Sequence, residues 1–175
     1  MTPIQVREAR PADAGTIAAF ARALSLEEGY AAPALQAEHV RAEGFGAVPR
    51  FRTLIAEQDG QAVGYALFYP SYDTDHAARG FYLQDLYVAP AARRQGAGRA
   101  LMAALARACE VDGGCYLFWN ALPGNRAGLA FYRAIGAEEE AVLTLSLHSR
   151  TRCGVSPGHH RRRQRAGEIM RACWP

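Results

Sequence analysis

A glycine-containing loop between an expected strand and an expected helix is the segment best suited to bind phosphate. It runs from Val88 to Leu101 and reads VAPAARRQGAGRAL. Gly96 and Gly98 let the backbone approach a ligand closely, and the free N–H groups that start a helix attract anions. Three arginines add positive charge around the same point: Arg93, Arg94 and Arg99. Diphosphate binding is the resulting hypothesis, and an ordinary strand-to-helix turn is the alternative.

Two common nucleotide-binding motifs do not fit this loop. The chain has no GxxxxGK[ST] segment, which disfavours a P-loop. The third glycine of a GxGxxG fingerprint is also missing, because Leu101 stands at that position. A dinucleotide-binding fold is therefore not expected.

A phenol in a later helix could donate a proton. Asn125, Gly128 and Tyr132 follow one another at spacings of three and four residues, so they share one face of the expected helix 125–135. Ala127, Phe131 and Ile135 would occupy a neighbouring face that suits the core. On this pattern alone, Tyr132 is either a general acid or a half-buried aromatic residue with its hydroxyl in water.

These residues lie within alternating strand and helix patterns. Asp59-Gly60 between two strand-like segments predicts a hairpin. A strand at 81–88, a helix at about 96–110 and a strand at 114–119 form a strand-helix-strand unit. Along 81–88, strict alternation predicts Gln84 on one face with Leu86 and Val88, and Asp85 on the other face with Leu83 and Tyr87. The order therefore predicts a mixed α/β domain. The remaining expected elements are strands at 3–8, 51–58, 61–69 and 141–147, and helices from Pro11 to about Leu26 and from Pro33 to about Glu43.

Charge divides the chain into a mildly acidic body and a basic tail. Residues 1–149 hold 13 arginines against 16 acidic residues, whereas residues 150–175 hold seven arginines against one glutamate. An acidic body favours a cationic substrate. The patterning stops near Ser149, and HHRRRQR predicts a solvated or disordered tail rather than a nucleic-acid or membrane contact.

Several classes of protein are not expected from the sequence. No signal peptide or stretch of about 18 apolar residues is visible, so we expect a cytoplasmic protein without a membrane span. The cysteines have no metal-binding spacing, so neither a metal site nor a disulfide framework is expected. They lie at positions 109, 115, 153 and 173.

Two motifs together resemble the GNAT N-acetyltransferase superfamily. RxxGxG, from Arg93 to Gly98, resembles its acetyl-CoA diphosphate signature, and NRAGLAFYRAIGA, from Asn125 to Ala137, resembles its later signature. REARPADAG, GFGAVPRF and YLQDLYV further resemble the diamine (spermidine/spermine) and thialysine N-acetyltransferase branch. The resemblance covers about residues 3–147. It implies one GNAT domain, residues 1–148, before the tail at 149–175. The implied sheet is central, mostly antiparallel and twisted, with helices on both faces.

The resemblance also implies roles for individual residues. The co-substrate would be acetyl-CoA, the acceptor a small amine, and the assembly a homodimer. Tyr132 would be the general acid. Asn125 and Gly128 would contact acetyl-CoA near its thioester. The backbone of three strand residues would pair with the pantetheine arm: Leu86, Tyr87 and Val88. The loop would hold the diphosphate through Arg93, Arg94, Gln95, Gly96, Ala97, Gly98 and Arg99.

The amine side departs from the branch. Gln84 stands where the polyamine branch has a glutamate, and Glu27 stands where it has a tyrosine, while Glu28 matches a substrate-contacting glutamate. Because Gln84 cannot accept a proton at neutral pH, a water chain to Glu27, Glu28 or Asp85 would replace it. A solvated position near a helix end is the alternative for the two glutamates. We expect an amine with fewer charges than a polyamine, such as an amino acid derivative or short aminoalkyl compound.

Two other functions remain compatible with the sequence. One is transfer to a protein N-terminus or lysine side chain, which needs an open groove for a peptide. The other is a silent acyl-CoA-binding sensor, which the missing carboxylate at Gln84 allows and the retained Tyr132 disfavours.

Overall fold

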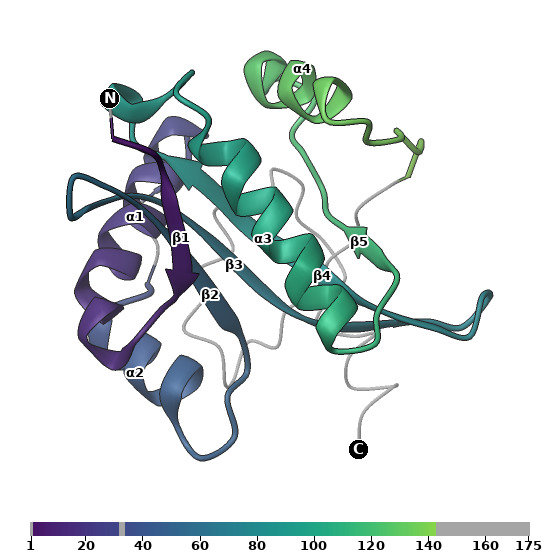
Figure 1. Ribbon diagram of the computed structural model, residues 1–175, viewed down its shortest axis with the longest axis horizontal. Helices are drawn as coiled ribbons and strands as arrows, with labels where there is room; N and C mark the ends of the chain where they lie inside the picture. The colour runs from purple at the N-terminus through teal and green to yellow at the C-terminus, as the bar shows by residue number, and fades with distance from the viewer. Residues whose placement is uncertain (1, 32–33, 143–175) are drawn as a thin grey trace, which may run out of the picture. The chain divides into compact units, whose positions relative to one another are not determined.

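A five-stranded sheet organises the part of the chain that carries the expected site. The computed structural model describes residues 2–31 and 34–142 (Figure 1). One compact unit ends at Ile135 and a second begins at Gly136. In the second unit, residues 136–142 form no helix or strand.

The elements of the first unit follow the expected order closely. The strands are β1 (Gln5–Glu8), β2 (Arg52–Gln58), β3 (Gln61–Asp73), β4 (Ala78–Val88) and β5 (Tyr116–Phe118). The α-helices are α1 (Ala14–Glu27), α2 (Ala37–Phe45), α3 (Ala97–Val111) and α4 (Arg126–Ala134). Short 3-10 turns, η1 (Pro11–Asp13) and η2 (Pro90–Ala92), precede α1 and α3.

The strands lie in the order β1-β2-β3-β4-β5. The first three neighbouring pairs are antiparallel, and β4 and β5 are parallel. The β2–β3 hairpin turns at Asp59 and Gly60, whose φ values of 51° and 75° are left-handed. Such a turn matches the twist of the two strands, so the predicted hairpin is confirmed.

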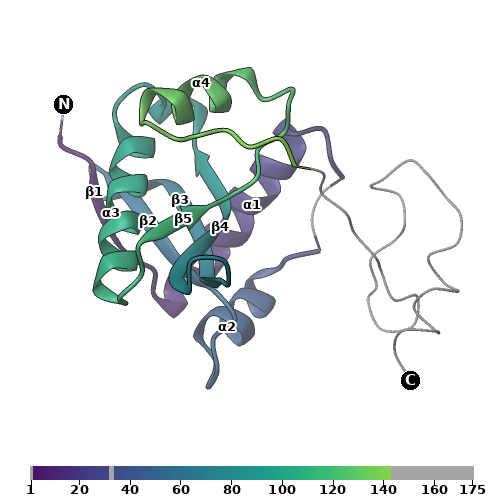
Figure 2. The ribbon, with the colours of Figure 1, turned by 90° about the vertical axis from the view of Figure 1, so that its right-hand side faces the viewer.

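Helices cover both faces of the sheet (Figures 1 and 2). On one face, Leu101 and Leu105 of α3 belong to a buried cluster that includes Phe68. On the other, Ile17 of α1 and Val40 of α2 are buried with the cluster that includes Tyr65. The structure therefore confirms a mixed α/β fold with a mostly antiparallel sheet and helices on both faces.

A β-bulge in β4 changes which residues share a face. Leu67 pairs with Asp85 and Phe68 with Leu83, so Gln84 is an extra residue in the strand. A bulge interrupts the regular alternation of side chains. Leu83 packs in the cluster under α3, together with Leu86 and Val88.

The expectation for the faces of β4 was therefore wrong in two respects. Asp85 was expected to share a face with Leu83 and Tyr87, but Leu83 lies on the opposite face, with α3. Gln84 was expected beside Leu86 and Val88. Instead, its side chain lies near the hydroxyl of Tyr69, which stacks on Tyr82 away from the α3 cluster. The extra residue in the strand is the physical reason for both differences.

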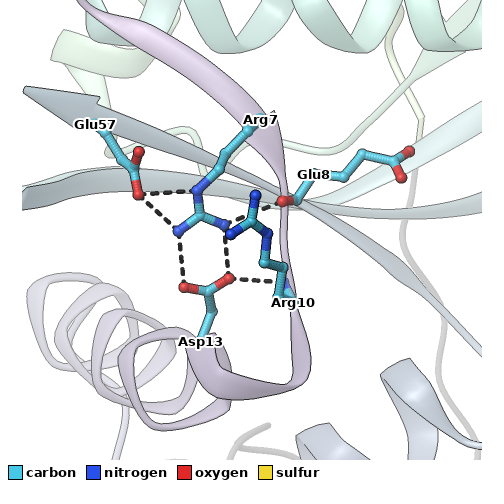
Figure 3. A network of polar contacts seen from close by, with 5 residues as sticks. All are labelled: Arg7, Glu8, Arg10, Asp13 and Glu57. Atoms are coloured by element: carbon cyan, nitrogen blue, oxygen red, sulfur yellow. Dashed lines mark hydrogen bonds and ion pairs between the residues drawn. The ribbon is translucent and has the colours of Figure 1, made fainter. Parts of the chain in front are cut away.

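An arginine joins β1 to β2 and to the start of α1 (Figure 3). The Arg7 guanidinium donates to both carboxylate oxygens of Asp13, at 2.7 and 2.9 Å, and to Glu57 at 2.6 and 2.9 Å. The pKa of Asp13 is lowered, first by its hydrogen bonds to Arg7. This network fixes the entry of the chain into α1.

The second helix begins later than expected. It starts at Ala37 rather than at Pro33, because Gln36 is extended, with φ −118° and ψ 167°. The Gln36 N–H donates to His39 Nδ1 at 3.1 Å, so Gln36 is the N-cap residue that precedes the helix. Pro33 itself, most of the expected strand 141–147 and the tail at 149–175 lie outside the described residues.

Candidate active site

The loop before α3 exposes backbone N–H groups at the start of a helix. Gly96 precedes the helix with a left-handed φ of 94°, and Arg94 is left-handed as well, at 63°. No side chain caps this helix end. Because the first residues of a helix have no preceding carbonyl to bond, the N–H groups of Ala97, Gly98 and Arg99 are available to an anion.

Side chains of the same loop brace its shape. Gln95 donates from Nε2 to the Ala91 carbonyl at 2.9 Å, and its Oε1 accepts from Gln58 Nε2 at 3.0 Å. Gln95 therefore ties the loop to the end of β2. Arg94 and Arg99 are exposed, and the Arg99 guanidinium reaches the Ala134 carbonyl at 3.4 Å.

Gly98 has a packing role that the motif alone does not reveal. A Cβ at this position would lie 3.3 Å from the ring of Phe131 in α4. The glycine therefore lets the first turn of α3 pack closely against α4. This contact brings the loop before α3, called the phosphate loop below after its expected role, and the helix carrying Tyr132 to the same end of the sheet (Figure 1).

The last part of β4 has no strand beside one of its edges among the described residues. β4 and β5 pair only over Gly80–Tyr82 and Tyr116–Phe118. Beyond Tyr82, β4 continues to Val88 with β3 on its other side. The backbone of Leu86, Tyr87 and Val88 lies along this unpaired edge, where an extended ligand could bind as an added strand.

The start of α4 is fixed by the asparagine of the second motif. Asn125 Oδ1 accepts from the Gly128 N–H at 2.9 Å and caps the helix. A Cβ on Gly128 would lie 2.5 Å from Asn125 Nδ2. The requirement for glycine at 128 therefore comes from the cap. Three residues of α4 were expected to face the core. Phe131 and Ile135 do pack against it. Ala127 is exposed, because it lies in the first turn of the helix.

Tyr132 is half-buried and held by an aromatic neighbour. Its ring lies 5.1 Å from the ring of Trp119, which follows β5. Burial raises the pKa of Tyr132, and the negative charge of Glu28 raises it further. The phenol therefore keeps its proton at neutral pH, as a proton donor must.

Two carboxyl groups lie near one another on the α1 side of the sheet. Asp85 accepts a 2.7 Å hydrogen bond from the hydroxyl of Tyr65, whose side chain is fully buried. Burial raises the pKa of Asp85, and the Tyr65 hydrogen bond acts in the opposite direction. The pKa of Glu28 is also raised, by partial desolvation and then by the charges of Asp85 and Glu27.

The other two residues expected on the amine side have different surroundings. Glu27 is the last residue of α1, and its carboxylate binds the Arg93 guanidinium at 2.6 and 2.8 Å. Gln84 Oε1 lies 3.5 Å from the hydroxyl of Tyr69. Glu28 thus lies within electrostatic range of both Asp85 and Tyr132. Glu27 instead lies against Arg93 of the phosphate loop.

Tyr65 and Trp119 contact the expected site residues but were not singled out from the sequence. Tyr65 lies on β3 opposite Tyr87, two residue positions from the pair of Leu67 and Asp85. Its position depends on the β3–β4 register, which the bulge at Gln84 changes. Trp119 lies just beyond β5, and its aromatic residue type is the only feature of the sequence that could have indicated a role in the site.

Neither a metal cluster nor a membrane span is found in the described residues. No group of three His, Cys, Asp or Glu side chains in residues 2–31 and 34–142 could hold a metal ion. None of the helices described is both long and apolar enough to cross a membrane.

Known proteins share both the sequence pattern and the fold. Residues 14–137 match the model of the acetyltransferase (GNAT) family. The thialysine N-epsilon-acetyltransferase of Bos taurus is 34% identical over 149 residues, covering 79% of this chain and 86% of the relative. A human spermidine/spermine N(1)-acetyltransferase-like protein 1 is 30% identical over 146 residues, covering 78% of this chain and 21% of the relative.

A solved structure supports the fold independently. An aminoglycoside acetyltransferase from an uncultured soil metagenomic sample superposes with a TM-score of 0.68 at 20% identity. The superposition covers 83% of this chain and 97% of that structure. At this level of identity the likeness concerns the arrangement of helices and strands alone.

Proposed function

The chain belongs to the GNAT acetyltransferase family and is an acyltransferase, and on that premise we propose that it acetylates a primary amine on a small cationic molecule. Acetyl-CoA is the co-substrate of this family. The observation that carries the proposal is that Glu28 lies within electrostatic range of both Tyr132 and Asp85. The neighbouring residue, Glu27, contacts Arg93 of the phosphate loop. This arrangement offers a proton donor and carboxyl groups as proton acceptors.

Acetyl-CoA would be held mainly by backbone groups. The uncapped N–H groups of Ala97, Gly98 and Arg99 suit the diphosphate, with Arg94 and Arg99 supplying charge at the surface. The unpaired edge from Leu86 to Val88 suits the amide groups of the pantetheine arm. Bound in this way, the thioester would lie near the end of β4.

The amine must lose a proton before it attacks the thioester. We assign proton acceptance to Asp85, reached directly or through water, and attraction of the ammonium group to Glu28. A carboxyl group with a raised pKa is a better base near neutral pH than an ordinary carboxylate. Tyr65 orients Asp85 through its 2.7 Å hydrogen bond.

The departing thiolate needs a proton, and Tyr132 would supply it. Its phenol stays protonated because burial and the charge of Glu28 raise its pKa. The Trp119 ring beside it restricts the directions in which the hydroxyl points. The same contact limits the entropy lost when the donor is aligned.

The acceptor is expected to carry fewer charges than a polyamine. Gln84 replaces a carboxylate with a neutral amide, and its neighbour Tyr69 is neutral as well, with a raised pKa. Glu27, a further carboxylate near this side, is paired with Arg93. A thialysine-like or amino-acid-like amine fits this reduced charge, and the bovine relative is named for thialysine.

The proposal extends to the rest of the protein. Residues 1–148 would form the catalytic domain and residues 149–175 a basic tail outside it. We expect a homodimer that acts in the cytoplasm, by resemblance to the diamine and thialysine branch.

The decisive experiment measures free-thiol release from acetyl-CoA with about fifty amines, including diamines, polyamines, thialysine and amino acids, beside a panel of peptides. Saturation with a small monoamine or amino-acid-like amine supports the proposal. Turnover confined to peptides would contradict it. Tight acetyl-CoA binding in calorimetry without thiol release for any acceptor would instead identify a sensor.

A further inference from the structure

An ion pair joins the end of α1 to the first residue of the phosphate loop motif. Arg93 and Glu27 lie 66 residues apart in the sequence, and one guanidinium nitrogen contacts both carboxylate oxygens, at 2.6 and 2.8 Å. The Arg93 Nε also donates to the Val88 carbonyl at 2.8 Å. The same guanidinium lies 5.8 Å from the centre of the Tyr87 ring.

These contacts argue against Arg93 as a simple phosphate ligand. Two of its donor nitrogens are committed to groups on β4 and α1 rather than to the loop. The carbonyl it contacts belongs to the last residue of β4, at the edge proposed for the pantetheine arm. Arg93 therefore lies where it fixes the direction in which the chain leaves the strand.

Glu27 lies at the opposite boundary of the site. It ends α1, and the next residue, Glu28, is the carboxylate whose charge acts on Asp85 and Tyr132. A restraint on Glu27 is thus a restraint on Glu28. The ion pair spans from the proposed amine side to the proposed diphosphate side of the reaction centre.

We infer that the Glu27–Arg93 ion pair holds the amine-binding end of α1 and the phosphate loop in a fixed arrangement. We call this ion pair the clasp. Arg93 then acts as a positioning residue, and Glu27 contributes to acetyl-CoA affinity without touching acetyl-CoA. This inference rests on the proposed function, because it assigns the clasp to the two substrates of that reaction.

The clasp and a direct phosphate contact predict opposite effects of neutralising Glu27. If Arg93 binds the diphosphate itself, Glu27→Gln removes a competing anion, and acetyl-CoA binds equally well or more tightly. If Arg93 is a positioning residue, Glu27→Gln releases the loop, and acetyl-CoA binds more weakly. Partly exposed ion pairs of this kind contribute modestly, so the expected loss is about 2–5-fold in Kd.

The test is a double-mutant cycle in the full chain. Calorimetry gives the Kd for acetyl-CoA of the wild type, Glu27→Gln, Arg93→Ala and the double variant. Steady-state kinetics gives the KM for the amine, and urea unfolding gives stability. Asp112→Asn is the matched control, because Arg52 and Asp112 form an ion pair with side chains 35% and 43% exposed, against 43% and 40% for Arg93 and Glu27.

The clasp predicts that Glu27→Gln weakens acetyl-CoA binding about 2–5-fold and raises the KM for the amine by a similar factor. The double variant should be no weaker than Arg93→Ala alone, because both changes break one interaction. Asp112→Asn should lower stability without changing the Kd.

Two results would overturn the clasp. One is an unchanged or lower Kd in Glu27→Gln, whether or not its stability falls. The other is strict additivity in the cycle. Absence of acetyl-CoA binding by the wild type would overturn the proposed function as well, and is seen before any variant is made.

Discussion

The hydroxyl of Tyr65, on a fully buried side chain, donates a 2.7 Å hydrogen bond to Asp85 on the neighbouring strand. Burial raises the pKa of Asp85, and this hydrogen bond partly offsets the effect because it stabilises the charged carboxylate. The strength of the proposed base therefore depends on Tyr65 as well as on burial. Removing the hydroxyl should change that strength while leaving the fold in place.

Tyr65→Phe should raise the pKa of Asp85 further, because the donor that favours the carboxylate is lost. The rise of kcat/KM with pH, which reports deprotonation of the base, should therefore move to higher pH. A pH profile at saturating acetyl-CoA measures the shift. Asp85 would not be the base if the profile of Tyr65→Phe coincided with that of the wild type.

Asp85→Asn should make the protein more stable at neutral pH while abolishing most activity. A carboxyl group with a raised folded pKa binds protons more readily in the folded state. Its contribution to stability is present below the unfolded pKa and is lost as pH rises through the folded pKa. Urea unfolding from pH 3 to 8 should show the advantage of Asp85→Asn growing with pH.

Asp13→Asn provides the opposite case for the same measurement. The folded pKa of Asp13 is lowered, first by its hydrogen bonds to Arg7. The contribution of Asp13 to the free energy of unfolding is therefore present above its unfolded pKa, and it is lost as pH falls through its folded pKa. This variant should be less stable at neutral pH and approach the wild type in acid. Parallel curves for the two variants would refute the assignment of the two shifts.

Tyr132→Phe should lower kcat by about 10²–10³-fold, which is within the range typical of a positioned acid. The Kd for acetyl-CoA should stay the same, because the hydroxyl is needed only when the thiolate leaves. Tyr116→Phe is the control, since that hydroxyl binds Ser71 Oγ at 3.1 Å on another part of the sheet. A kcat within twofold of wild type would exclude Tyr132 as the acid.

Gly96→Ala should weaken acetyl-CoA binding by straining the phosphate loop. A Cβ at this position meets no atom within 4 Å, so the effect comes from the left-handed φ of 94° alone. Such a conformation costs about 1–2 kcal/mol for a residue with a side chain. Gly113→Ala is the matched control, with φ 76° and no close atom. It should lose similar stability in urea unfolding and keep its Kd.

Gln84→Glu should move the preference toward acceptors with a second ammonium group. The new carboxylate would lie near Tyr69, where the present amide is neutral. The ratio of kcat/KM for a diamine to that for the matching monoamine should rise by about tenfold, equivalent to about 1.4 kcal/mol. An unchanged ratio would place the far end of the acceptor elsewhere.

Local patterns predicted most elements because each one depends on nearby residues. The Asp59-Gly60 turn, the helix after Gly96 and the cap at Asn125 follow from backbone preferences that short segments carry. The start of α2 was placed too early, at Pro33, because the extended backbone of Gln36 is not evident from residue types.

The site was predicted less completely because its contacts join distant segments. The motifs identified the phosphate loop and the Tyr132 helix, but no local pattern links Glu27 to Arg93. The faces of β4 were assigned by strict alternation, which an extra residue in the strand invalidates. Strand register and ion pairs between distant segments depend on how the whole chain folds, so they cannot be predicted from short stretches of sequence.

The bulge in β4 requires a residue at position 84 but does not require a particular amino acid there. Asp85 lies on the α1 side because one additional residue stands between it and Leu83. Any amino acid at position 84 preserves the number of residues between Leu83 and Asp85. The side chain at this position can therefore change without moving Asp85. Deleting the residue would instead rotate either the proposed base or its hydrophobic neighbours to the wrong side of the sheet. The acceptor specificity proposed for this position can therefore change by substitution but not by deletion.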